Sequence, residues 1–256
     1  MYLYIFLFIL GLCVGSFLNV LIDRLPKGES ILGRSYCPYC KKKLEWYELV
    51  PLFSFIFLKG KCRACKRSIS WQYPFIELTS GLLFTFTYYL LIVNNQWSPV
   101  NFLFYLFFTS LLIVIFTTDL KYYIVSDKIV FLAIVLALFY QIYRINQFSE
   151  LLNPIISAIS ASVFFYFFVG ISGGKWMGMG DVKIAGFMGI LLAFPNVLIG
   201  LAVAFLSGAV VGLILVAMKK KGLKSEIPFG CFLAPATYIA IFFGGEIIEW
   251  YLNLII

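Results

Sequence analysis

The sequence of 256 residues contains no histidine. A Ser-His-Asp triad, a Cys-His protease and an H-E-x-x-H zinc peptidase all need that side chain, so these three hydrolytic mechanisms are excluded. Any proton transfer by this protein must use Asp, Glu, Lys, Tyr or Cys instead.

Charged residues are scarce as well. They make up 12% of the chain, against about 25% in a soluble domain, while 62% of the residues are hydrophobic. This leaves too little polar surface for a water-exposed globule, and it excludes disorder, collagen and a disulfide-rich secreted scaffold. We therefore predict an all-α, polytopic membrane protein whose main solvent is the lipid bilayer. Membrane topology explains the net charge of +8, so no nucleic-acid partner is expected.

Long apolar runs predict about eight membrane spans, since a helix needs about 20 apolar residues to cross the hydrocarbon core. The predicted spans are Met1–Ile22, Pro74–Val93, Val100–Thr118, Lys128–Tyr143, Pro154–Ile171, Ile184–Phe194, Val197–Met218 and Phe229–Ile256. The first lacks the basic start of a signal peptide, so we expect it to be retained. The sixth is short, and a re-entrant segment there would move the C-terminus to the other side.

Positive charge alternates between the connecting loops. The segments that hold every Lys and Arg except Arg144 are 23–73, 119–128, 172–183 and 219–228. By the positive-inside rule these segments are cytoplasmic and both termini face outward. The expected organisation is a first span at 1–22, a zinc-ribbon-like cytoplasmic loop at 23–73 and a membrane-embedded bundle at 74–256.

Four cysteines of the cytoplasmic loop form two C-x2-C pairs, which are Cys37-Pro-Tyr-Cys40 and Cys62-Arg-Ala-Cys65. Each pair places two thiolates on one tight turn, and two such turns close a tetrahedral four-thiolate zinc site. The loop has one apolar stretch, Val50–Leu58, so a bound metal would supply the missing folding energy. Two disulfides or four free thiols are the alternatives, and a reducing cytoplasm disfavours disulfides. The spacing predicts a structural Zn²⁺ site.

The other two cysteines, Cys13 and Cys231, lie singly in apolar runs. We expect them to be small residues that face lipid or the protein core.

Two acids lie at the cytoplasmic edge of apolar spans. Asp119 ends the third predicted span, and Asp181 lies in a G-x-G-D segment at the start of the sixth. Ionisable residues at such positions are functional candidates. Asp181 could instead be a helix N-cap. Asp119 lies at a C-terminal helix end, where a carboxylate opposes the helix dipole, so capping does not explain it.

A pair of carboxylates suits peptide hydrolysis without histidine. Two that lie close together cannot both ionise cheaply, so they share a proton. The ionised member takes a proton from water, and the protonated member donates to the scissile carbonyl oxygen. Gly178 and Gly180 would let the backbone approach a substrate strand closely.

Several motifs together resemble the type IV prepilin peptidases, the bacterial leader peptidases of pili, competence pseudopili and type II secretion. Besides the two C-x2-C pairs they are Gly15-Ser-Phe-Leu-Asn-Val20, Arg24-Leu-Pro26, Gly60-Lys-Cys62, Tyr73-Pro-Phe-Ile-Glu77, Trp176-Met-Gly-Met-Gly-Asp-Val-Lys183 and Ile227-Pro-Phe-Gly230. The resemblance covers nearly the whole chain. It implies an all-helical intramembrane aspartic endopeptidase of the G-x-G-D type in the bacterial cytoplasmic membrane.

This resemblance also implies substrates and site residues. The substrates would be prepilins or pseudopilins, which lose a short basic leader after a Gly on the cytoplasmic side. The catalytic pair would be Asp119 and Asp181, and the residues that support the catalytic loop would be Gly178, Gly180, Lys183 and Asp127. The family usually has I-P-D or I-P-N after its first aspartate, where this chain has Ile124-Val-Ser-Asp127. Asp127 is therefore the alternative first acid, and Asp119 is preferred because the family pattern tolerates Asn at the second position.

Many relatives also N-methylate the new N-terminus with S-adenosylmethionine. The chain has no G-x-G-x-G cofactor loop, so this cofactor would bind at the membrane-edge loops. The candidate cofactor residues are Glu48, Lys61, Tyr73 and Glu77, although Tyr73 and Glu77 could simply anchor the second span at the interface.

Two rival functions stay open. Intramembrane acids also mark the proton relays of transporters, and a zinc loop could belong to a scaffold that binds a partner. Neither predicts a G-x-G-D acid together with a four-cysteine loop.

Overall fold

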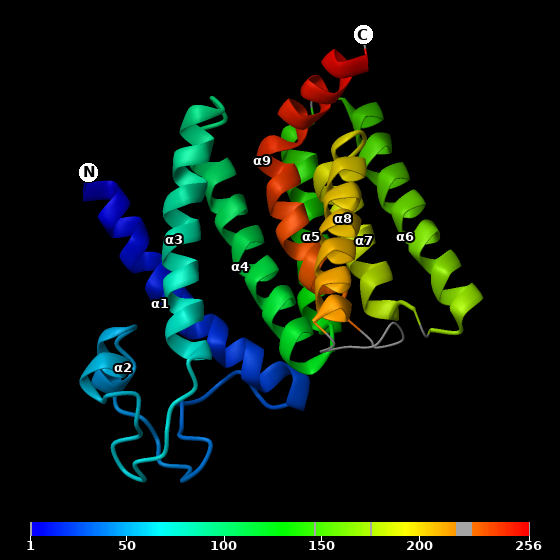
Figure 1. Ribbon diagram of the computed structural model, residues 1–256. Helices are drawn as coiled ribbons and strands as arrows, with labels where there is room; N and C mark the ends of the chain where they lie inside the picture. Colours follow the sequence, from blue (N-terminus) through cyan, green and yellow to red (C-terminus); the bar gives the residue numbers. More distant parts are fainter. Residues whose placement is uncertain (1, 146, 175, 219–226, 256) are drawn as a thin grey trace. The chain divides into compact units, whose positions relative to one another are not determined.

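The computed structural model describes residues 2–145, 147–174, 176–218 and 227–255 (Figure 1). The predicted span ends Met1 and Ile256, and most of the basic segment 219–228, lie outside this described part. All regular secondary structure of the described residues is helical, apart from two isolated antiparallel bridges, Tyr36 with Lys43 and Lys61 with Ser68. The prediction of an all-α protein is confirmed.

Eight of the described helices correspond to the eight predicted spans. Their bounds are α1 Tyr2–Arg24, α3 Gln72–Val93, α4 Pro99–Tyr122, α5 Asp127–Arg144, α6 Leu152–Ser172, α7 Met179–Leu192, α8 Asn196–Ala217 and α9 Gly230–Ile255. The short elements are η1 Leu25–Lys27, η2 Trp46–Glu48, α2 Phe53–Phe57 and η3 Phe148–Leu151. The predicted break at Pro195 is confirmed, because α7 ends before it and α8 follows it.

Six helices of the described chain, namely α1, α3, α4, α6, α8 and α9, are long and apolar enough to cross a membrane. The other two predicted spans are α5, which carries Asp127, Lys128 and Arg144 within 18 residues, and α7, which has 14 residues. At 1.5 Å per residue α7 is about 21 Å long, shorter than a hydrocarbon core of about 30 Å. Its side chains are almost all buried, so other helices rather than lipid surround it.

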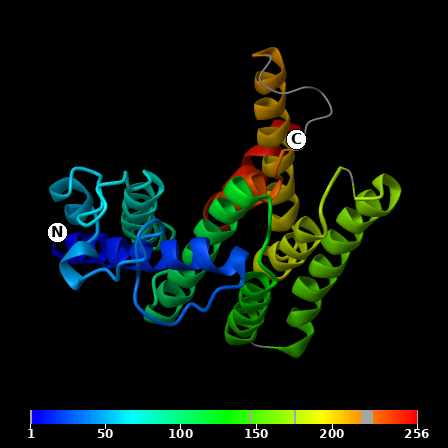
Figure 2. The same ribbon diagram turned by 90° about the horizontal axis from the view of Figure 1, so that it is seen from below.

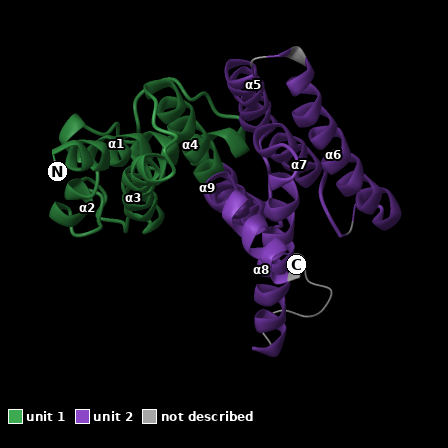
Figure 3. Cartoon of the chain, turned by 90° about the horizontal axis from the view of Figure 1, so that it is seen from above, with its two compact units in different colours: residues 1–114 green, residues 115–256 purple. Residues whose placement is uncertain are grey.

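The helices gather into two compact units, Met1–Val114 and Ile115–Ile256 (Figure 3). In the first unit α1 packs along α3, and the segment with the four cysteines joins the C-terminal end of α1 to the N-terminal end of α3. In the second unit α7 contacts α5, α6, α8 and α9. The functional division at 1–22, 23–73 and 74–256 stays a prediction.

Small residues let α1 and α3 approach closely. A Cβ on Gly11 would lie 2.6 Å from the Ser80 carbonyl oxygen, and a Cβ on Gly15 would lie 2.7 Å from the Glu77 Cα. Helices in lipid associate through such close backbone contacts, because lipid provides no hydrophobic driving force between them. Gly15, the first residue of the opening motif, therefore has a packing role.

The same device places α7 beside α6 (Figure 2). A Cβ on Gly189 would lie 2.4 Å from the Ala158 Cα. At its C-terminal end α7 is also held by α5, because the Gln141 amide donates to the carbonyls of Ile190 at 2.6 Å and Leu191 at 3.1 Å. These carbonyls belong to the last turn of α7, where no intrahelical donor is available.

Side-chain bonds mark the two ends of the second unit. At one end Lys183 near the start of α7 pairs with Asp127 at the start of α5. At the other end the Asn153 side-chain amide donates to the Phe194 carbonyl and accepts from the Phe194 N–H, both at 3.0 Å. The α4–α5 and α6–α7 connections therefore share one end, as alternating spans require.

Candidate active site and metal site

Asp119 lies in the last turn of α4, with a side chain only 5% exposed. Its Oδ2 accepts a hydrogen bond of 2.9 Å from the Cys231 backbone N–H. Gly230 and Cys231 open α9, and the first N–H groups of a helix have no intrahelical partner. The positive end of the α9 dipole thus faces the Asp119 carboxylate, whose negative charge is disfavoured by the C-terminal end of the α4 dipole. A Cβ on Gly230 would lie 2.7 Å from the Asp119 Oδ2, so glycine allows this approach.

Asp181 is the third residue of α7 and is 7% exposed. The N-cap of α7 is Gly178, whose backbone N–H donates to the Asp181 Oδ2 at 3.2 Å. Asp181 is therefore not the N-cap, although its carboxylate reaches back to the N-cap amide as in a capping box.

The two buried aspartates belong to one electrostatic group. The charge of Asp119 acts on the Asp181 carboxyl, and both charges act on the Cys231 thiol. Both Cys13 and Cys231 were expected to face either lipid or the protein core. Cys231 is buried in the core, whereas Cys13 is exposed on α1. Sequence reasoning missed the place of Cys231 beside the carboxylates. The only signal for it was its position directly after the Ile227-Pro-Phe-Gly230 motif.

The residues predicted to support the catalytic loop lie around the start of α7. Lys183 Nζ contacts Asp127 Oδ1 at 2.6 Å, and the Asp127 side chain is 74% exposed. Gly180 packs against the α4–α5 connection, where its Cβ would lie 2.8 Å from the Val125 Cβ. Asp127 is thus outside the buried group, while Gly180 holds the connection after Asp119 against the helix of Asp181.

The four cysteines of the predicted metal site come together. Their sulfur atoms all lie within 4.8 Å of one another, and the Cys37 and Cys65 sulfurs are 3.9 Å apart. Four thiolates at about 2.3 Å from a tetrahedral Zn²⁺ stand about 3.8 Å apart, so the cluster fits this ion. No disulfide joins these four cysteines in the described structure.

The two cysteine turns have the same backbone geometry. The Lys41 N–H donates to the Cys37 carbonyl and the Lys66 N–H to the Cys62 carbonyl, both at 2.9 Å, and both lysines have φ of 59°. In the second turn the backbone amide of Cys65 is the main cause that lowers the pKa of the Cys62 thiol to about 7. The thiolate, which is the form that binds metal, is therefore favoured at Cys62.

Residues of the opening motif fix the path of the chain toward the first cysteine. The buried Arg24 guanidinium donates to the backbone carbonyls of Ser30 at 3.0 Å and Arg34 at 3.1 Å, and it lies 5.4 Å from the centre of the Tyr36 ring. Arg24 therefore holds the segment that leads to Cys37.

Two of the predicted cofactor residues hold the cysteine loop to the helices. The Tyr73 hydroxyl donates to Asp23 Oδ2 at 2.6 Å, which joins the end of α1 to the start of α3 on either side of the loop. Glu77 Oε2 accepts the Leu52 backbone N–H at 2.8 Å. Both side chains therefore have partners within the protein, and their part in cofactor binding stays a prediction.

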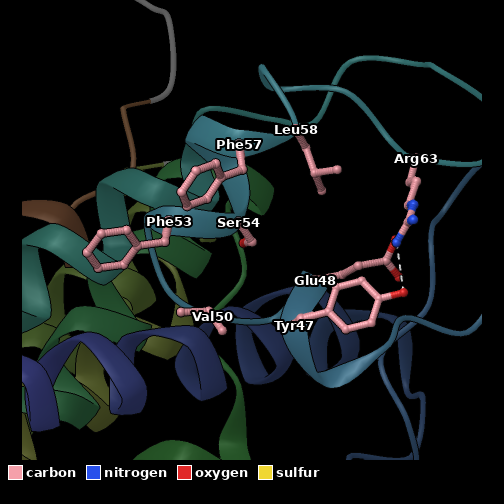
Figure 4. Close-up of a pocket in the computed structure, with 8 residues that line it drawn as sticks. All are labelled: Tyr47, Glu48, Val50, Phe53, Ser54, Phe57, Leu58 and Arg63. Carbon is pink, nitrogen blue, oxygen red and sulfur yellow. Dashed lines mark hydrogen bonds between the residues drawn. The ribbon is translucent and has the colours of Figure 1, made fainter.

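A third predicted cofactor residue, Glu48, lines a cavity of about 480 Å³ between η2, α2 and the second cysteine turn (Figure 4). The cavity is lined by Tyr47, Glu48, Val50, Phe53, Ser54, Phe57, Leu58 and Arg63. The Arg63 guanidinium donates to the Tyr47 hydroxyl at 2.8 Å. Of the four predicted cofactor residues, all of them described, Glu48 alone lines this cavity. Sequence reasoning missed Tyr47 and Arg63, which flank motif residues.

Comparison with known proteins gives two family matches. The model of the bacterial peptidase A24 N-terminal domain matches residues 9–91, and that of the type IV leader peptidase family matches residues 106–213. No solved structure matches this chain.

Three similar relatives are all called prepilin leader peptidase/N-methyltransferase. The relative from Stutzerimonas stutzeri is 29% identical, over 96% of this chain and 92% of its own length. That from Bacillus subtilis is 29% identical over 97% of each, and that from Myxococcus xanthus is 34% identical over 87% of this chain and 66% of its own. The chain therefore belongs to the type IV leader peptidase family and is a multi-pass peptidase of the inner membrane.

Proposed function

We propose that this protein is an intramembrane aspartic endopeptidase that removes the short basic leader of type IV prepilins or pseudopilins at the cytoplasmic side. The new N-terminus is then N-methylated with S-adenosylmethionine. The observation that carries the proposal is a pair of buried, interacting carboxylates on different helices, Asp119 of α4 and Asp181 of α7. The names of the relatives support the choice of substrate.

In the proposed reaction the two aspartates share one proton. The ionised carboxylate takes a proton from water while the water oxygen attacks the scissile carbonyl carbon. The protonated carboxyl donates its proton to the carbonyl oxygen. The C–N bond then breaks as the leaving nitrogen takes the proton that came from water, and a hydroxyl of the intermediate returns a proton to the second carboxylate. In each aspartate a backbone N–H binds Oδ2, which orients the carboxyl group before substrate arrives.

Asp119 suits the first catalytic position better than Asp127 does. Asp119 is buried and its charge acts on Asp181, whereas Asp127 is exposed and its Oδ1 is already paired with Lys183. In our proposal this ion pair has a positioning role: it ties α5 to α7 near Asp181.

The four cysteines Cys37, Cys40, Cys62 and Cys65 would hold a structural Zn²⁺, which closes the loop by joining two distant turns. The loop would thereby keep Arg63 in place at the cavity that Glu48 lines.

We propose this cavity as the place of methyl transfer. Its volume of about 480 Å³ lies in the range of small-molecule sites. S-adenosylmethionine supplies an electrophilic methyl group, and it combines an adenine ring with a positive sulfonium. The Tyr47 ring and the Glu48 carboxylate are the side chains that would hold these two parts. Tyr73 and Glu77 would act indirectly, through their bonds to Asp23 and Leu52, and Lys61 would act through its place next to Cys62.

Leader cleavage is tested with purified protein and a prepilin-like polypeptide that has a basic leader, a Gly and a following hydrophobic helix. Mass spectrometry should find cleavage after the Gly. A matched polypeptide with that Gly replaced by a bulky residue should stay intact. A wild-type polypeptide that is bound or transported but never shortened would favour the transporter or scaffold alternative.

Methyl transfer is tested separately with Glu48→Gln. This variant keeps an oxygen that can accept the Glu45 N–H, which the native Glu48 Oε2 does at 2.9 Å, but it removes the negative charge. Methylation of the cleaved product should fall while cleavage persists. Full methylation by the Glu48→Gln variant would contradict the proposed role of Glu48 in methyl transfer.

A further inference from the structure

The short helix α2 presents an apolar face outward. Phe53, Ile56 and Phe57 stand at i, i+3 and i+4, so they share one face of the helix. Their side chains are 59%, 68% and 80% exposed, respectively. An exposed face of large apolar residues in a connecting loop marks an interaction site.

Two contacts place α2 beside a membrane-spanning helix. The Leu52 N–H, directly before α2, donates to Glu77 Oε2 at 2.8 Å. Glu77 is the sixth residue of α3, so it lies about 7.5 Å along that helix from its first residue. The Phe55 ring of α2 packs on Trp71, the residue before α3, with ring centres 4.9 Å apart. The apolar face therefore lies at the level of the first turns of α3.

The charge and the aromatic residues around α2 suit a lipid headgroup layer. Residues 24–73 contain eleven Lys and Arg but three Glu, which favours an anionic surface. Trp46 and Trp71 are both more than three-quarters exposed, and Trp is the residue type enriched at membrane–water interfaces. A positively charged protein segment would be repelled by the same loop, which makes lipid the better occupant of this face.

We propose that α2 is an interfacial membrane anchor, in which Phe53, Ile56 and Phe57 insert among the headgroups and upper acyl chains of an anionic leaflet. Phe53 and Phe57 also line the cavity of Glu48, so the anchor holds that cavity at the bilayer surface. If the proposed function holds, the freed N-terminus of a membrane-embedded substrate emerges at this surface. The anchoring itself does not depend on that function.

The test uses the full-length protein in vesicles of phosphatidylglycerol and phosphatidylcholine. The photoreactive residue p-benzoylphenylalanine replaces Phe57 in one variant and Tyr39 in a matched control. Tyr39 is an exposed ring of the first cysteine turn, and the Arg67 guanidinium lies 4.8 Å from its centre. Both replacements exchange one aromatic ring for another. After irradiation, mass spectrometry measures the lipid adduct at each position.

We expect at least about fivefold more lipid adduct at position 57 than at position 39, with a lower yield at 57 in vesicles of phosphatidylcholine alone. Equal yields at the two positions would overturn the proposal, and so would the absence of lipid adducts at 57. A position-57 adduct with an added prepilin-like polypeptide in place of lipid would assign the face to substrate and also overturn it. The readout needs no cleavage, so an Asp119→Asn protein that fails to cut substrate should give the same adducts.

Discussion

At the scale of single residues, the two glycines of the G-x-G-D segment have different surroundings. Gly180 lies against Val125, where an added Cβ would come within 2.8 Å of the Val125 side chain. Gly178 has space for a Cβ, since the nearest atoms lie 3.9 Å away. From the sequence alone, both glycines are expected to play the same role, which is to let the backbone approach a substrate strand closely. The contacts indicate that Gly180 sets the distance between α7 and the segment after Asp119.

Gly180→Ala should therefore reduce leader cleavage far more than Gly178→Ala. The new Cβ at position 180 pushes the start of α7 from Val125 and shifts Asp181 relative to Asp119, and a displacement of about 1 Å can cost about 100-fold in rate. Gly178→Ala keeps the backbone N–H that binds Asp181. The measurement is kcat for cleavage by both variants, and equal losses would contradict a packing role that belongs to Gly180 alone.

At the scale of elements, the start of α9 serves a carboxylate on another helix. The Cys231 N–H binds Asp119 across 112 positions of sequence, and Gly230 leaves room for the contact. The last residue of the Ile227-Pro-Phe-Gly230 motif therefore has a structural role at the candidate active site, although the motif contains no group that could do acid–base chemistry.

Gly230→Ala should lower kcat for cleavage by at least about tenfold and alter its pH dependence, because a Cβ displaces Asp119 from the N–H that stabilises its charge. Gly245→Ala is the matched control in the same helix, since nothing lies within 4 Å of a Cβ there. The measurement is the pH profile of kcat for both. A Gly230→Ala enzyme with the wild-type profile would show that α9 does not position Asp119.

The cysteine loop is an element that, in our proposal, depends on a bound Zn²⁺. We expect about one Zn²⁺ per chain in the purified protein, and its loss in Cys62→Ser together with a lower thermal unfolding temperature. Cys13→Ser, at an exposed position of α1, should keep both. Acid should also release the metal, because protons compete with Zn²⁺ for the four thiolates. Elemental analysis would contradict the ligand set if Cys62→Ser kept full zinc.

At the scale of the whole molecule, the loop charges predict which side of the membrane each connection faces. Every lysine of the sequence lies in a segment expected to be cytoplasmic. A membrane-impermeant amine reagent should therefore label no lysine in intact cells and should label the loop lysines after lysis. Mass spectrometry of the labelled peptides gives the answer. If Lys41 or Lys59 were labelled before lysis, the proposed orientation would be contradicted.

Much of this architecture could be predicted from the sequence, because hydropathy and motif spacing are local signals. They gave the helical spans, the break at Pro195 and the cysteine cluster. Contacts between distant segments could not be predicted in this way. Neither the Cys231 amide at Asp119 nor the Leu52 amide at Glu77 leaves a periodic or compositional trace, since both bonds use a backbone group that every residue carries.

The same limit applies to α7 and to the cavity. The short sixth span looked like a weak crossing, yet it is the most enclosed helix of its unit because small residues on α6 and α7 let it pack closely. The cavity combines Glu48 with Arg63, which are 15 positions apart and meet only because the cysteine turns fold the loop back.

The central claim is that Asp119 and Asp181 act together as one catalytic unit. Its most direct test is cleavage of the prepilin-like polypeptide by Asp119→Asn, Asp181→Asn, the double variant and Asp127→Asn, with membrane folding checked in each. Each of the first two should lower kcat by at least about 1,000-fold, and the double variant should be no worse than either, because residues that act as a unit are not additive. Asp127→Asn should keep substantial activity. An active Asp119→Asn enzyme would contradict the account and move the first carboxylate to Asp127.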